Sequence, residues 1–113
     1  MRRERRKYAR VNTVLYATFS DGTRKIREVI RNASAGGMMI ETEEPWKIGT
    51  ILDLIIDARS SIKGQGKVVW TAKYGEGYRM GIELKNLSLD AATVWADALM
   101  SFTDLWTKAG TDN

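Results

Sequence analysis

The sequence of 113 residues contains no cysteine and no histidine. Without cysteine, disulfide frameworks, thiolate metal sites and cysteine nucleophiles are excluded, and without histidine so is every catalytic triad that depends on an imidazole base. The chain also lacks the spacing of a P-loop and a clustered acidic motif that would support metal-dependent chemistry. We therefore expect a binding module rather than an enzyme, with no catalytic residue, no metal and no cofactor.

Long apolar segments are missing too. No apolar run reaches about 18 residues, and the arginine-rich N-terminus lacks the apolar stretch of a secretory signal. These absences predict a soluble cytoplasmic protein without membrane insertion. The length is typical of one domain.

The net charge of +4 is unevenly distributed along the chain. Residues 1–31 hold 10 Lys and Arg against 3 Asp and Glu, whereas residues 32–113 hold 8 against 11. The first segment therefore carries +7 and the remainder −3. Such an asymmetry indicates a local site for an anion or an acidic partner, rather than a uniformly basic surface.

Alternating apolar and polar residues between turn signals predict about six short strands. Asp21-Gly22 predicts a hairpin between the first two, and the small polar segment 32–37 predicts an interruption of strand pairing. Strands of this number and length are typical of a small antiparallel barrel. The expected strands are 11–19, 24–31, 38–42, 50–56, 62–71 and 78–84.

The period changes near the C-terminus. Apolar residues recur every three or four positions from Leu89 to Lys108, which predicts one amphipathic helix. Ser88 is placed to cap its N-terminus. We expect the apolar face of this helix to cover an open end of the barrel, and residues 109–113 to form a tail.

The first ten residues are the most basic part of the chain. Read alone, a short basic terminus is most simply a solvated arm. Arg6 and Arg10, however, are four residues apart and would share one side of a helix or of a strand, so their two guanidinium forks can converge on one anion. The planar fork makes bidentate bonds to phosphate or to a guanine edge. Arg5 would point elsewhere in a regular segment.

A second cluster, Asn32-Ala33-Ser34-Ala35-Gly36-Gly37, is most simply a turn when read alone. If Asn32 and Ser34 stay extended, an amide and a hydroxyl face the same way, and Gly37 leaves room for close approach to the backbone. Such a set can read a nucleobase edge and hold a phosphate.

Together, Arg6-x-x-x-Arg10 and Asn32-x-Ser34-x-x-Gly37 resemble the two-part signature of the PilZ domain, the bacterial receptor module for cyclic diguanylate (c-di-GMP). The resemblance covers nearly the whole chain, including Val68-Val69-Trp70, residues 78–84 and the terminal helix. It implies a mainly β fold, a six-stranded antiparallel PilZ-type β-barrel with a C-terminal amphipathic α-helix. Residues 1–10 would form a basic ligand-binding arm, and residues 11–108 the barrel domain with its helix at about 89–108.

The resemblance also implies which residues bind c-di-GMP. The arginines would contact phosphates and guanine edges, Asn32 and Ser34 would contact guanine and phosphate, and Gly37 would keep the turn open. Trp70 would line the ligand surface, although a large residue at the end of a Val-Val strand is more often part of the core. The implied set is Arg5, Arg6, Arg10, Asn32, Ser34, Gly36, Gly37 and Trp70.

Three functions remain open at this point. In the favoured function, c-di-GMP binds and orders the N-terminal arm, which changes the surface offered to a downstream protein partner. We expect the ligand to bind as an intercalated pair. The second is a small barrel that binds single-stranded nucleic acid, which explains the charge but not the second motif. The third is a protein-interaction adaptor with the PilZ fold and no ligand, which the intact motifs argue against.

Overall fold

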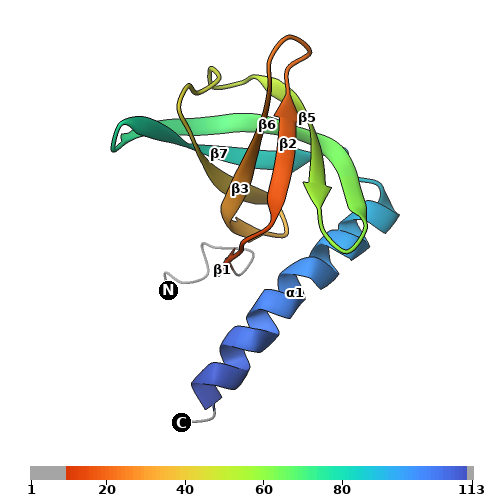
Figure 1. Cartoon of the computed structure of the whole chain (residues 1–113). Helices are drawn as coiled ribbons and strands as arrows, with labels where there is room; N and C mark the ends of the chain where they lie inside the picture. The colour runs from red at the N-terminus through yellow and green to blue at the C-terminus, as the bar shows by residue number, and fades with distance from the viewer. Residues whose placement is uncertain (1–9, 112–113) are drawn as a thin grey trace, which may run out of the picture.

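The computed structural model describes residues 10–111, with side chains for residues 10–102. This part of the chain contains seven strands and one helix (Figure 1). They are β1 (Val11–Asn12), β2 (Tyr16–Ser20), β3 (Lys25–Ser34), β4 (Gly37–Thr42), β5 (Ile51–Asp57), β6 (Ser61–Tyr74), β7 (Gly77–Lys85) and α1 (Leu89–Thr111).

The strands close into an antiparallel barrel. β3, β2, β5, β6, β7 and β4 are neighbours in that order, and β3 pairs in turn with β4 to complete the ring of six. β1 adds a short pairing to β3 beyond the end of β2, with Val11 opposite Ala33 and Asn12 opposite Asn32. The predicted six-stranded antiparallel barrel with a C-terminal helix is therefore confirmed.

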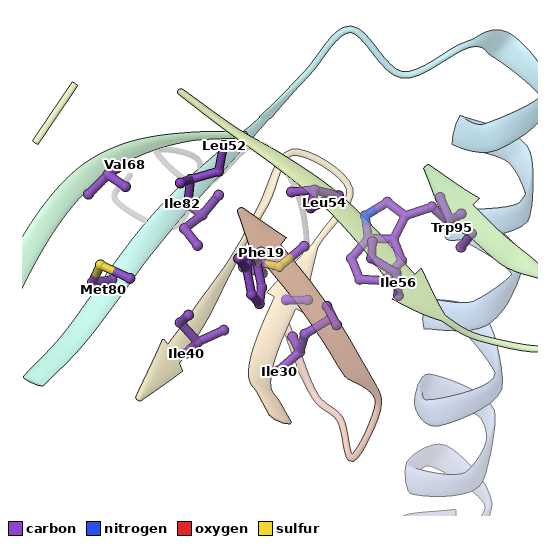
Figure 2. Close-up of a cluster of buried hydrophobic side chains, with 14 of the residues drawn as sticks. Phe19, Ile30, Ile40, Leu52, Leu54, Ile56, Val68, Met80, Ile82 and Trp95 are labelled. Atoms are coloured by element: carbon purple, nitrogen blue, oxygen red, sulfur yellow. The ribbon is translucent and has the colours of Figure 1, made fainter. Parts of the chain in front are cut away.

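The core follows from the two-residue period of the strands. In β5, Leu52, Leu54 and Ile56 are buried, while the residues between them are exposed. Every strand of the ring contributes inward side chains in the same way, and α1 adds Trp95. Figure 2 labels the central set: Phe19, Ile30, Ile40, Leu52, Leu54, Ile56, Val68, Met80, Ile82 and Trp95.

The strand expected over residues 11–19 is in fact two strands. The Thr13 hydroxyl donates to the carbonyl oxygen of Ile30 at 2.6 Å and accepts the Leu15 amide at 3.1 Å. These bonds replace regular strand pairing, so the chain turns between β1 and β2. The register against β3 consequently shifts by one residue between β1 and β2.

The interruption expected over residues 32–37 is shorter than predicted. β3 continues through Ser34, and only residues 35–36 form the turn before β4. A register shift between Ile30 and Asn32 places an extra residue in β3. Ile30 and Ala33 are consequently both fully buried, and Asn32 and Ser34 share the opposite face. Pairing with β1 and β4 overrides the weak strand propensity of these small residues.

The helix α1 covers one end of the barrel with its first half and continues beyond it (Figure 1). The Ser88 hydroxyl accepts the Ala91 amide at 3.0 Å, which confirms Ser88 as the N-terminal cap. Trp95 is 1% exposed and Leu99 also belongs to the core. The helix ends at Thr111, three residues later than the sequence predicts. Within the residues described, no helix is long and apolar enough to cross a membrane.

Candidate functional site

A hollow of about 370 Å³ lies on the outer side of the barrel, where β4, β6 and β7 meet the end of β3 and Arg10, the residue before β1. It faces away from the core, because Gly81 and Glu83 of β7 alternate with the buried Met80 and Ile82. Its lining consists of Arg10, Ser34, Gly36, Gly37, Met38, Val69, Trp70, Gly81, Ile82 and Glu83.

Two glycines allow close packing of the strands and of Trp70 beside this hollow. A Cβ atom on Gly37 would lie 2.6 Å from the carbonyl oxygen of Ile82, and one on Gly81 would lie 2.5 Å from Cδ1 of Trp70. Only glycine fits at these two positions, because the β7 backbone packs against Gly37 and the Trp70 indole packs on Gly81. The indole therefore lies directly on the β7 main chain beside the hollow.

Trp70 forms a wall of the hollow. The register of β6 against β7 shifts between Val68 and Trp70, which places Val69 in a bulge. Val68 remains buried, whereas Val69 and Trp70 are each 41% exposed, and the Trp70 indole lies against Gly81. The interpretation of Trp70 as a core residue is therefore wrong, because the bulge turns its side chain outward.

Arg10 and Asn32 meet at the rim of the hollow. Nε and Nη2 of Arg10 donate to Oδ1 of Asn32 at 3.2 and 2.6 Å. The pairing of Asn12 with Asn32 carries the residues before β1 to this point. Two sequence patterns that are separated by more than twenty residues are thereby brought together.

Rigid parts of the fold hold the second motif. Ser34 is 5% exposed, and its carbonyl oxygen accepts the indole N–H of Trp95 at 3.1 Å. The carbonyl oxygen of Gly36 accepts the Leu84 amide at 2.8 Å, which ties the turn between β3 and β4 to β7. The motif is therefore fixed by the helix on one side and by the barrel on the other.

The predicted site residues gather around this one hollow, as far as the structure describes them. Arg10, Ser34, Gly36, Gly37 and Trp70 line it, and Asn32 holds Arg10 at its rim. Arg5 and Arg6 lie outside the described residues.

Sequence reasoning missed Val69, Gly81 and Glu83 as lining residues. A glycine inside a strand marks close approach by a neighbour, so Gly81 carried a usable signal. The exposure of Val69 depends on the bulge, and no comparable signal pointed to Glu83.

The polar side chains that line the hollow are those of Arg10, Ser34, Trp70 and Glu83. Displaced pKa values occur elsewhere on the barrel: backbone amides of Arg24 and Thr23 lower the pKa of Asp21, and burial raises the pKa of Glu28. Neither of these carboxyl groups lines the hollow. In the part of the chain that is described, no cluster of three or more acidic, histidine or cysteine side chains could hold a metal ion.

A second hollow of about 450 Å³ lies between α1 and the turn that joins β5 to β6. Leu15, Val94, Ala98 and Phe102 make its lining largely apolar. None of the predicted ligand-binding residues lines this second hollow.

A comparison with protein-family models finds one whose description is PilZ domain, matching residues 4–100. That range includes both sequence motifs and all seven strands. No curated protein matches the chain.

Several solved structures share the fold. The inhibitor of motility MotI/DgrA from Bacillus subtilis is 20% identical, with a TM-score of 0.76 over 91% of this chain and 52% of that one. The PilZ domain of YcgR from Escherichia coli, solved with c-di-GMP, is 15% identical, with a TM-score of 0.73 over 95% of this chain and 98% of that one. The MrkH–c-di-GMP complex from K. pneumonia is 17% identical, with a TM-score of 0.74 over 96% of this chain and 54% of that one. The chain thus spans about half the length of MotI/DgrA and MrkH.

Replacing Gly81 with alanine should displace the Trp70 indole, because the new methyl group would occupy space that the ring fills. The off-rotamer position should cost about 1 kcal/mol, leaving the barrel folded. In ¹H–¹⁵N spectra the indole N–H resonance of Trp70, assigned with Trp70→Phe, should shift. The resonances of the buried Trp46 and Trp95 serve as internal controls and should stay in place. An unmoved Trp70 resonance would contradict the packing described.

Proposed function

The chain belongs to the PilZ domain family, and on that basis we propose that it is a receptor module that binds c-di-GMP in the hollow beside Trp70. The observation that carries the proposal is the contact between Arg10 and Asn32, which joins the arginine segment and the second motif in one site. The solved PilZ domain of YcgR and MrkH, both in complex with c-di-GMP, support the choice of ligand through the shared fold.

The chemistry of the hollow suits a compact dianion with two guanine bases. The Arg10 guanidinium can bind a phosphate through two parallel hydrogen bonds. The amide of Asn32 can pair with a base edge, and Ser34 adds a hydroxyl-bearing residue to the lining of the hollow. The indole of Trp70 offers an exposed aromatic face on which a base can stack.

Arg5 and Arg6 precede this site in the chain, outside the residues described. By the family resemblance we propose that they add two further guanidinium forks to that of Arg10. Three forks suit a larger anionic ligand than one dinucleotide, and we therefore propose that an intercalated pair of c-di-GMP molecules binds.

The signal would pass through the N-terminal arm. Arg10 directly precedes β1, a strand of two residues that pairs with β3. Ligand phosphates that engage the arginines would order the arm against the outer face of the barrel. This order–disorder change would alter the surface offered to a downstream protein partner.

The competing functions differ in the ligand that they require. A barrel that binds single-stranded nucleic acid would bind oligonucleotides with steep salt dependence and ignore cyclic dinucleotides. An adaptor would bind neither ligand.

Calorimetric titration with c-di-GMP, GTP and a short oligonucleotide should separate these functions. The wild type should bind c-di-GMP selectively. Arg10→Ala and Arg6→Ala should each weaken binding by roughly tenfold to a hundredfold, the worth of a charge-assisted hydrogen bond of about 1.5–3 kcal/mol. Arg59→Ala removes the same charge from the turn between β5 and β6 and should leave affinity unchanged, because Arg59 does not line the hollow. Preference for the oligonucleotide, or binding of neither ligand, would reject the proposal.

At saturation the wild type should bind two molecules of c-di-GMP per chain. Arg5→Ala removes one of the three forks and should reduce the stoichiometry to one. The measurement is the molar ratio at the inflection of the calorimetric titration. One ligand per wild-type chain would rule out the intercalated pair while leaving the site itself intact.

Saturating c-di-GMP should slow amide hydrogen exchange in residues 2–12, because ordering of the arm protects backbone amides. Exchange in β5, which lies away from the hollow, provides the internal control and should not change. Equally fast exchange of residues 2–12 with and without ligand would refute the proposed switch.

A further inference from the structure

Glu83 places a carboxylate in a hollow that is otherwise suited to an anion. It is the one acidic side chain among the described residues that line this hollow. It lies on the outward face of β7, directly opposite Gly37 of β4. Its side chain is 50% exposed and forms an ion pair with Lys85 at 3.3 Å. A carboxylate near two phosphates is unfavourable unless it meets hydrogen-bond donors of the ligand.

Guanine offers such donors. Its Watson–Crick edge presents the N1–H and the 2-amino group side by side, and the two oxygens of a carboxylate can accept both. Adenine presents an acceptor at N1 in place of a donor. An ionised carboxylate only accepts hydrogen bonds, so it favours guanine and opposes adenine.

Asn32, the other candidate reader of a base, cannot make this distinction alone. Its amide carries a donor and an acceptor and can turn to match either purine. Its oxygen also already accepts two hydrogen bonds from Arg10. A group that only accepts hydrogen bonds makes this distinction at the N1–H and 2-amino positions.

We propose that Glu83 specifies guanine in this hollow, an inference that rests on the function proposed above. Trp70 lies opposite Gly81, and Glu83 follows two residues along β7, about 7 Å further along the strand. A base stacked on the Trp70 indole can therefore direct its edge toward the Glu83 carboxylate. The carboxylate then accepts hydrogen bonds from the N1–H and amino donors of the base in place of its contact with Lys85. Two lysines offset the carboxylate charge near the phosphates: Lys85, and Lys67 of β6, which lies opposite Glu83 in the strand register.

The test compares c-di-GMP with cyclic diadenylate on the wild type and on Glu83→Gln. Glutamine keeps the shape of the side chain but presents both a donor and an acceptor. We expect Glu83→Gln to weaken c-di-GMP binding by about tenfold or more. Binding of cyclic diadenylate should stay equal or become stronger, so the selectivity ratio falls by at least about tenfold. Glu76→Gln, an exposed change in the turn between β6 and β7, is the matched control and should preserve the ratio.

Cyclic diinosinate supplies a second measurement, because it keeps the N1–H and lacks the 2-amino group. The wild type should bind it with an affinity between those of the other two dinucleotides. The inference would be overturned if Glu83→Gln left binding unchanged, or if it weakened the binding of all three dinucleotides equally. If the wild type binds no cyclic dinucleotide, the proposed function itself fails. If the wild type binds c-di-GMP and Glu83→Gln retains its selectivity, only the role of Glu83 is wrong.

Discussion

The pairing of β3 with β4 closes the barrel, and the same pairing builds the hollow. Asn32, Ala33 and Ser34 lie opposite Met39, Met38 and Gly37. Without these pairs the ring of strands would be open, and β1 would have no ordered edge on which to bring Arg10 to Asn32. Closure of the barrel and the shape of the hollow therefore depend on the same few backbone hydrogen bonds, and a change that loosens one loosens the other.

The two faces of this strand pairing have different roles, one in the core and one in the hollow. Ala33 and Met38 are almost fully buried and belong to the core, while Ser34 and Gly37 line the hollow, which Met38 also borders. The indole of Trp95 bridges the two, because it is packed in the core and donates to the carbonyl oxygen of Ser34. Burial of this ring stabilises the fold and fixes the motif strand, which links the first half of α1 to the geometry of the site.

The sequence predicts the barrel and the helix well because their signals are periodic and local. The departures occur where a partner decides the conformation. The Thr13 hydroxyl competes for backbone groups and divides the first strand, and neighbouring strands hold residues 32–34 extended although their composition is that of a turn. Trp70 points outward because of a bulge that appears only when β6 is aligned with β7. Glu83 joins the hollow for the same kind of reason, since its place depends on the register of three strands.

The contact between Arg10 and Asn32 has a further consequence for binding. It holds the Arg10 guanidinium at the rim of the hollow before any ligand arrives. This lowers the conformational entropy that the side chain would lose on binding a phosphate in place of Asn32. The amide of Asn32 is neutral, so it competes with a phosphate for these donors less strongly than a carboxylate would. In the proposed function, release of Arg10 would free the Asn32 oxygen to accept from a base. The contact would thus organise the proposed site while leaving both side chains available to c-di-GMP.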